Sequence, residues 1–285
     1  LSQFLQQKYK ETADTLTPAV SSFKSKDNVA EAQFYIGSSQ YRLGDYEAAA
    51  AALKASNEAN PNWSRSDEVL LDLARVQQKQ EKLDEAVATI KEVLAKYPDS
   101  SLLDRAHFQL AQYSFDQGDF KTAAAEYGKV IETWPDSAFV PPALYGKGWS
   151  EQRLDDNFQG GIEDFTAYLK TNPSGSSATV ARYNLGLCQA EAKQFDEAIK
   201  TYQGILKDDP EYAETDKVLY ELGWTFKSQD KDAEAVPYFA KLASAHPDSP
   251  RAAEAHYHVG EDKYDTETLA AAADSDADAK AQTKR

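Results

Sequence analysis

Apolar residues recur at helical spacing in short blocks along the chain, and polar breaks separate the blocks. Between Arg105 and Pro135, the side chains of Phe108, Ala111 and Phe115 are three and four residues apart, so they share one face of a helix. After a break, a second block has the same spacing, with Ala123, Tyr127, Val130 and Ile131. The pattern predicts two helices that form a hairpin.

The breaks contain residues that end one helix and begin the next. Gly118 suits a left-handed C-terminal cap, and Asp119 is able to cap the following helix. Pro135 ends the second helix, because proline does not continue a helix. Two pairs have the spacing of a capping box, Ser64 with Asp67 and Ser101 with Asp104.

This hairpin recurs along the chain at a nearly fixed interval. The closing prolines, spaced 37, 37, 38, 37 and 37 residues apart, are Pro61, Pro98, Pro135, Pro173, Pro210 and Pro247. Small residues follow the same interval at Gly37, Ala74, Ala111, Gly148, Gly186, Gly223 and Gly260. A fixed period of this size predicts an array of stacked helix pairs, in which each unit contacts its neighbours.

The period also divides the chain. Residues 1–29 are expected to be a partial repeat, formed by the end of a first helix and a second helix. Residues 30–248 hold six helix pairs, and 249–265 the first helix of a further repeat. Residues 266–285 are a polar tail or linker rich in Ala and Asp. Because neither end resembles a polar capping unit, we expect the chain to be a segment of a longer array.

Composition excludes some classes of function. The net charge of −16, from 47 acidic and 31 basic residues, argues against nucleic acid as a partner, since phosphate binding needs a concentrated basic face. The acidic surface either keeps the array soluble or favours basic partners. No apolar run reaches the roughly 18 residues of a membrane span, and Cys188 is expected to be a small buried filler.

Two of the units carry a pattern that resembles the tetratricopeptide repeat. One supplies Leu185, Gly186, Phe195, Ala198, Tyr202 and Pro210. Another supplies Ile36, Gly37, Gly44, Asp45, Tyr46, Ala49 and Pro61. The resemblance covers residues 30–264 and implies an all-α fold, a right-handed superhelical solenoid of antiparallel helix pairs. The Pro-Asp-Ser turns are similar to those of bacterial envelope members, such as outer-membrane assembly lipoproteins and the Tol–Pal coordinating periplasmic protein.

In this family the first helix of each pair lines a concave surface that faces the ligand. The resemblance therefore places an aromatic row in that groove, made of Phe34, Tyr41, Phe108, Phe115, Tyr145, Trp149, Tyr183, Leu187, Tyr220, Trp224 and Tyr257. Two interpretations of the rings stay open: packing between neighbouring helices, or anchoring of a partner, for which Tyr and Trp are well suited. If the groove interpretation holds, Trp224→Ala weakens partner binding and leaves helical content nearly intact.

Other chemistry has little support in the sequence. Some relatives hold a partner's C-terminal carboxylate with basic side chains, but the matching residues here are scattered: Arg75, Arg153, Asn184, Lys217 and Lys227. No phosphate loop, nucleophile elbow or paired cysteine motif occurs, and His256 and His258 point about 200° apart on a helix. The sequence therefore predicts no enzyme, no cofactor and no metal.

These observations predict a non-enzymatic scaffold that binds a protein or peptide through an aromatic-rich concave groove. Two alternatives remain: a structural or self-assembling array, and an accessory interaction domain attached to an enzyme outside this segment. The envelope resemblance favours the bacterial periplasm over the cytoplasm.

Overall fold

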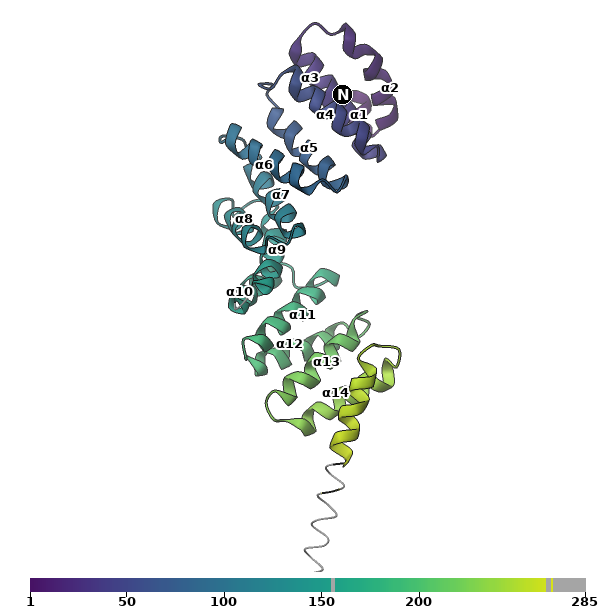
Figure 1. Ribbon diagram of the computed structural model, residues 1–285, viewed down its shortest axis with the longest axis vertical. Helices are drawn as coiled ribbons and strands as arrows, with labels where there is room; N and C mark the ends of the chain where they lie inside the picture. The colour runs from purple at the N-terminus through teal and green to yellow at the C-terminus, as the bar shows by residue number, and fades with distance from the viewer. Residues whose placement is uncertain (155–156, 265–267, 269–285) are drawn as a thin grey trace, which may run out of the picture. The chain divides into compact units, whose positions relative to one another are not determined.

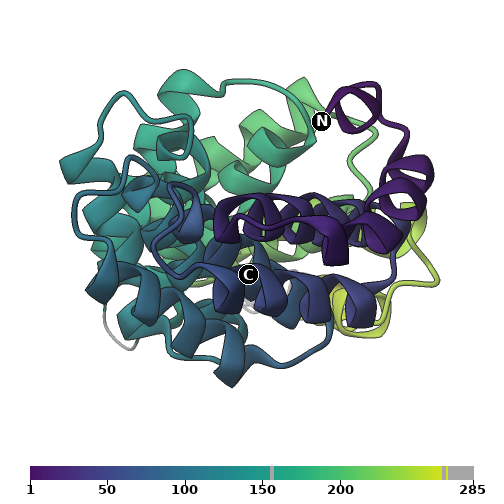
Figure 2. The same cartoon turned by 90° about the horizontal axis from the view of Figure 1, so that it is seen from above.

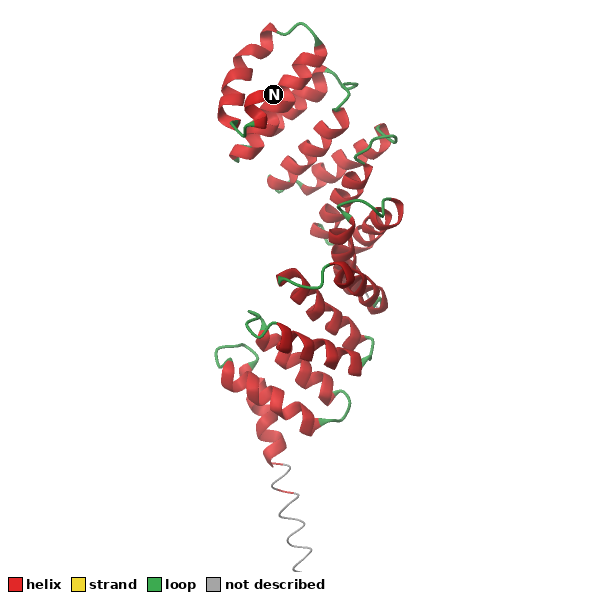
Figure 3. Cartoon of the chain, turned by 180° about the vertical axis from the view of Figure 1, so that it is seen from behind, coloured by secondary structure: helices red, strands yellow, loops and turns green. Residues whose placement is uncertain are grey.

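The computed structural model describes residues 1–154, 157–264 and 268. Within these residues the chain is helical and contains no strand (Figure 3), which confirms the all-α prediction. The chain divides into two compact units, Leu1–Leu154 and Asp155–Arg285, and each is described by itself. Of the predicted tail, 266–285, all but Thr268 lies outside the described residues.

Unit 1 is a stack of antiparallel helices in which each helix packs on the next one in sequence (Figures 1 and 2). Its elements are α1 (Ser2–Leu5), α2 (Tyr9–Ala19), the 3₁₀ helix η1 (Val20–Ser22), α3 (Lys26–Leu43), α4 (Tyr46–Ala59), α5 (Ser66–Lys79), α6 (Leu83–Lys96), α7 (Leu103–Asp116), α8 (Phe120–Thr133) and α9 (Val140–Arg153).

Unit 2 continues the same alternation of helices. Its elements are α10 (Phe158–Thr171), α11 (Ser176–Glu191), α12 (Phe195–Asp208), α13 (Thr215–Lys227) and α14 (Asp232–Ala245), followed by a helical stretch over 252–264. Among the described helices of both units, none combines the length and the apolar character that a membrane span requires.

The ladder of small residues marks where the two helices of a pair touch. A β-carbon on Gly37 would lie 2.7 Å from Cγ of Leu53, and one on Gly223 would lie 2.5 Å from Cζ of Phe239. Gly186 meets the ring of Tyr202 in the same way. The small residue of the first helix thus makes room for a large side chain of the second, which is why both recur with one period.

The turns inside the pairs that the structure describes in full share one residue in the left-handed conformation. Gly118 has φ 79° and Asp119 accepts a hydrogen bond of 3.1 Å from the amide of Thr122, which confirms both predicted caps. Where the same turn lacks glycine, Glu81 and Lys193 adopt φ values of 62° and 60°. The repeat therefore preserves the backbone conformation even where the residue carries a Cβ.

The capping-box prediction is wrong, because neither α5 nor α7 has a side-chain cap. Asp104 instead bonds to the next repeat: its Oδ2 accepts a hydrogen bond of 2.6 Å from the hydroxyl of Ser137. The Ser137 oxygen also accepts from the amide of Phe139. The same contact joins each of the other Pro-Asp-Ser serines to an aspartate 33 residues earlier, Ser100 to Asp67 and Ser249 to Asp216.

Glutamines at the ends of first helices form a second set of contacts between repeats. The amide of Gln117 donates a hydrogen bond of 2.7 Å to Asp84 in unit 1, and that of Gln229 donates one of 3.2 Å to Asp196 in unit 2. Both pairs are 33 residues apart. The acidic residues in the first turns of helices therefore join neighbouring repeats, in addition to favouring the helix N-terminus.

Cys188 occupies the interior of unit 2. Its side chain is fully buried in α11, and burial raises the pKa of the thiol to about 12. This agrees with the predicted role as a small buried filler, since a protonated and inaccessible thiol is inert.

Candidate partner-binding cavity

Unit 1 contains a cavity of about 730 Å³ on the side formed by its first helices. Its lining residues are Tyr41 from α3; Arg75, Gln78 and Lys79 from α5; Phe108, Gln109, Gln112, Tyr113, Phe115 and Asp116 from α7; Tyr127 from α8; and Pro142, Tyr145, Gly146, Trp149 and Arg153 from α9. We call it the first-helix cavity. Its size is that of a site for a small ligand or a short peptide segment.

Rings form the middle of the first-helix cavity. Tyr145 and Trp149 meet edge to face with their ring centroids 6.4 Å apart. Phe108 lies 5.7 Å from the ring of Tyr127, which passes so close to Gly146 that a β-carbon there would be 2.5 Å from Tyr127 Cζ. Glycine at that position allows the Tyr127 ring to reach the cavity wall.

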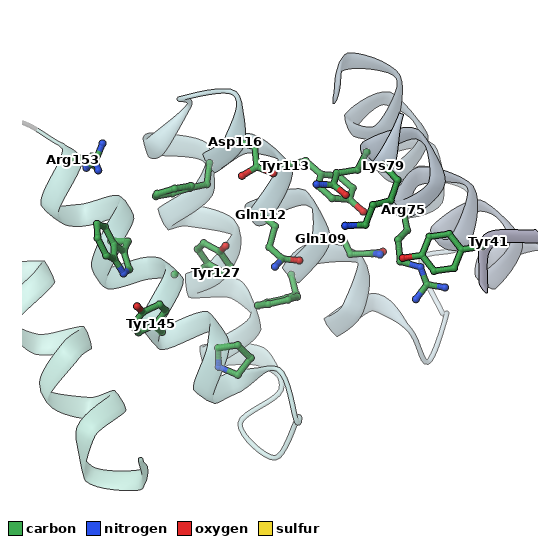
Figure 4. A pocket seen from close by; sticks show the side chains of 16 residues that line it. Tyr41, Arg75, Lys79, Gln109, Gln112, Tyr113, Asp116, Tyr127, Tyr145 and Arg153 are labelled. Carbon is green, nitrogen blue, oxygen red and sulfur yellow. The ribbon is translucent and has the colours of Figure 1, made fainter. Parts of the chain in front are cut away.

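Basic side chains lie toward the two ends of the cavity (Figure 4). The guanidinium of Arg75 lies 4.6 Å from the ring centroid of Tyr41 and bonds Asp72 at 2.9 Å. At the other end, the guanidinium of Arg153 lies 5.8 Å from the ring centroid of Trp149. Lys79 and Arg153 line the cavity, are exposed, and form no ion pair with any residue that the structure describes.

One carboxylate faces these cations. Partial burial raises the pKa of the Asp116 carboxyl, and a hydrogen bond from Gln78 opposes that rise. Tyr113, which also lines the cavity, is 4% exposed, and burial raises the pKa of its phenol well above the ordinary value. The cavity therefore combines a cationic excess with an apolar, aromatic wall.

The first-helix cavity brings together five of the eleven residues predicted for the groove; of the other six, Phe34 lies in unit 1 and five lie in unit 2. Those that line the first-helix cavity are Tyr41, Phe108, Phe115, Tyr145 and Trp149. Phe34 does not line it: only 3% of this residue is exposed, and its ring packs against Tyr35 and Trp63 beneath the guanidinium of Arg65. At Phe34 the packing interpretation is the correct one, because the ring is inaccessible to a partner.

In unit 2 the predicted residues are packed to different extents. Tyr183 and Leu187 are half-buried, with Tyr183 against the ring of Tyr202. Tyr220 is half-buried beside Trp224 and donates a hydrogen bond of 3.0 Å to Glu254. These residues combine core packing with a partly accessible edge.

Among the predicted residues of unit 2, Trp224 and Tyr257 differ most in how far their rings are packed. The ring of Trp224 contacts both His258, at 5.0 Å, and Phe239, at 6.4 Å. Tyr257 is 63% exposed. Truncating Trp224 would therefore remove core packing as well as surface, so the Trp224→Ala variant is expected to be less stable rather than to keep its helical content nearly intact.

The polar positions also differ between the units. Arg75 and Arg153, which stand in different repeats of the sequence, line the same cavity with Lys79. In unit 2, Lys217 pairs with Glu214, and Lys227 pairs with Asp232 at 3.1 Å and Glu261 at 3.4 Å. Asn184 is buried and bonds the carbonyl of Val180. Sequence reasoning missed Lys79, although it follows Arg75 by one helical turn.

Family models described as tetratricopeptide repeat match most of the chain. One covers residues 40–110, a second covers 5–62 and 145–213, and a third covers 105–137 and 217–249. The chain belongs to the tetratricopeptide repeat family. Repeats of this family are in general non-catalytic modules for protein interaction.

Solved tetratricopeptide repeat structures share the fold and confirm the predicted fold class. The C-terminal part of a repeat protein from Cytophaga hutchinsonii has a TM-score of 0.69 at 14% identity, over 89% of this chain and 96% of that one. A protein from Parabacteroides merdae has a TM-score of 0.59 at 19% identity, over 75% and 79%. YrrB, described as having an unusual peptide-binding site, has a TM-score of 0.60 at 18% identity, over 73% of this chain and 99% of that one. No curated protein sequence matches the chain.

Proposed function

We propose that this tetratricopeptide repeat protein is a non-enzymatic scaffold that binds a protein or peptide through the first-helix cavity of unit 1. The observation that carries the proposal is the joint lining of one 730 Å³ space by rings and basic side chains from four successive first helices. Half-buried Tyr and Trp rings beside Arg are the residues that dominate binding energy at interfaces.

Two further observations support this choice of partner class. The rings of Tyr145 and Trp149 are half-buried, so part of their surface is available without unfolding the helices. YrrB, which has the same fold, is described as having a peptide-binding site. An extended peptide fits a surface made of parallel helices, because it contacts several repeats at once.

A matched pair of tryptophans tests the proposal. Trp149 in unit 1 and Trp224 in unit 2 occupy equivalent positions in their repeats, 75 residues apart. Peptides are selected on the full-length chain from a random display library, and their affinities are measured by titration calorimetry. We expect Trp149→Ala to weaken binding roughly 30-fold, the cost of about 2 kcal/mol at a hot spot.

The Trp224→Ala variant is the control for location, with circular dichroism and thermal unfolding as the check on folding. It is expected to lower the stability of unit 2 and to leave the affinity unchanged. Loss of binding in Trp224→Ala alone, with unit 2 still folded, would move the site to unit 2.

Self-assembly is a second candidate, favoured by one observation. Tyr257 and Tyr264 on the helical stretch 252–264 are 63% and 71% exposed, and exposed rings of this kind are suited to contact between protein copies. Sedimentation over a range of concentrations separates the two, since assembly that depends on concentration favours this candidate. A location in the bacterial envelope is also part of the proposal, and its support is the form of the Pro-Asp-Ser turns.

A further inference from the structure

The charge of the first-helix cavity is opposite in sign to that of the chain. The protein has 16 more acidic than basic residues, whereas the cavity is lined by Arg75, which is paired with Asp72, and by Lys79 and Arg153, against the single lining carboxylate of Asp116. A partner that enters this space therefore meets a cationic site on an acidic protein. Such a site selects anionic groups, and the surrounding acidic surface repels an anion that does not fit the cavity.

Two buried polar atoms in the cavity are unpaired within the described part of the chain. They are Nε of Arg75, which is a donor, and Oε1 of Gln109, which is an acceptor. Gln109 is 7% exposed, and Figure 4 shows it between Gln112 and Arg75. A buried polar atom without a partner is costly, so a ligand that supplies one acceptor and one donor gains from both.

A peptide main chain carries that combination. Each residue other than proline presents one N–H donor and one carbonyl acceptor, which match Gln109 Oε1 and Arg75 Nε. The rings of Phe108, Tyr145 and Trp149 line the same cavity as these two atoms and the basic side chains. They are suited to an aromatic or aliphatic side chain of the same segment.

We infer that the first-helix cavity binds the interior of an extended acidic segment of a partner protein. Acidic side chains of the segment pair with Lys79 and Arg153 at the two ends, and an apolar side chain lies among the rings. Its main chain bonds Gln109 and Arg75. This inference rests on the proposed function and adds the chemistry of the partner. A free C-terminus is not required, because the charged groups come from side chains.

The test uses short synthetic peptides and the full-length protein, with fluorescence anisotropy as the readout. The parent peptide is acetylated and amidated, with a central Trp between two Asp residues. Three companions have Asn or Lys in place of Asp, or a free C-terminal carboxylate. We expect the Asp peptide to bind at least about tenfold more tightly than the Asn peptide, as charge-assisted hydrogen bonds require. The Lys peptide is expected not to bind, and the free carboxylate to add little.

Variants of the protein locate the effect. Lys79→Gln and Arg153→Gln are each expected to weaken binding of the Asp peptide several-fold and to leave binding of the Asn peptide unchanged. Asp116→Asn is expected to strengthen binding of the Asp peptide, because it removes the one carboxylate among the residues that line the cavity. Gln109→Leu is expected to weaken binding of both the Asp and the Asn peptide, because it removes the side-chain oxygen that accepts from the peptide main chain. Lys91→Gln, an exposed lysine of α6 outside the cavity, is the matched control and leaves both affinities unchanged.

Four results would overturn the inference. Equal binding of the Asp and Asn peptides would show that acidic side chains are not selected. Binding that depends on the free carboxylate would identify terminal capture instead. Tighter binding of a single-stranded oligonucleotide, lost in the Lys79 and Arg153 variants, would assign the cavity to nucleic acid. If the Asn peptide binds at the cavity and the Asp peptide has no advantage, the proposed function survives; if no peptide binds, both fail.

Discussion

A β-carbon placed on Gly186 would lie 2.4 Å from Cε1 of Tyr202, the ring of the second helix in the same repeat. Tyr202 is fully buried, so its ring has no space to withdraw. This contact explains why a small residue recurs at this position of each repeat, and it sets the distance between α11 and α12.

Replacing Gly186 by alanine is therefore expected to destabilise unit 2. Overpacking costs about 1–3 kcal/mol, and the better helix propensity of alanine returns up to about 1 kcal/mol. The net result is a decrease of up to about 2 kcal/mol in the free energy of unfolding, measured with urea. Gly204 in α12 has no atom within 4 Å of an added β-carbon, so Gly204→Ala is the control and should stabilise. Equal stabilisation by both changes would refute the packing account.

The hydrogen bond from Ser137 to Asp104 gives a prediction about contact between repeats. Ser137→Ala removes a hydrogen bond to a carboxylate and is expected to lower the free energy of unfolding by about 1–2 kcal/mol. Ser101 is exposed and makes no side-chain hydrogen bond to a described residue, so Ser101→Ala should change stability by less than about 0.5 kcal/mol. The reverse order in thermal unfolding would restore the capping-box interpretation.

For the turns inside the helix pairs, we expect two substitutions to change the free energy of unfolding in opposite directions. Lys193→Gly should raise the free energy of unfolding by about 0.5–1 kcal/mol, because glycine accepts a positive φ that strains lysine. Gly118→Ala, at the equivalent turn in unit 1, should lower it by about 1 kcal/mol. Both are measured by urea unfolding. Changes of the same sign would mean that the left-handed residue does not determine the stability of these turns.

Glu126 gives a prediction about pH. Burial alone would raise the pKa of its carboxyl, but hydrogen bonds with His107 and Lys129 outweigh burial, and the pKa is lowered from its ordinary value of 4.5. A lowered carboxyl pKa stabilises the fold above about pH 5 and loses that contribution as the pH falls through the folded-state value.

The stability of the native protein should therefore decrease more steeply below pH 4.5 than that of Glu126→Gln. Thermal unfolding at a series of pH values from neutral to acidic measures both curves. Parallel curves across the acidic range would show that the Glu126 carboxyl has no such role.

The periodic residues made most of the fold predictable from sequence. The prolines end helices, the small residues allow two helices to pack closely, and Gly118 adopts a positive φ. The position of each helix and of the turns inside the pairs can therefore be predicted from single residues. The sequence pattern pairs Asp104 with Ser101, whereas in the structure Asp104 bonds Ser137 of the next repeat. A serine beside the start of a helix fits the capping pattern whether or not it forms the cap. The choice depends on packing between repeats, which local spacing does not describe.

The site was predictable in part for the same reason. The repeat register placed Tyr145 and Trp149 on first helices, and both line the cavity. The same register also selected Phe34, whose ring is buried beneath Arg65. Register identifies the helix face, whereas exposure depends on neighbours such as Trp63, which lies in a connecting turn. The basic side chains of the cavity come from different repeats, so only the fold brings them together.

Hydrogen exchange of the full-length protein, with and without a selected peptide, tests the central claim most directly. Binding in the first-helix cavity predicts slower amide exchange in α5, α7 and α9, and unchanged exchange in α11 to α14. Protection confined to unit 2, or peptide binding that leaves α5, α7 and α9 unprotected, would contradict the assignment of the binding site to unit 1.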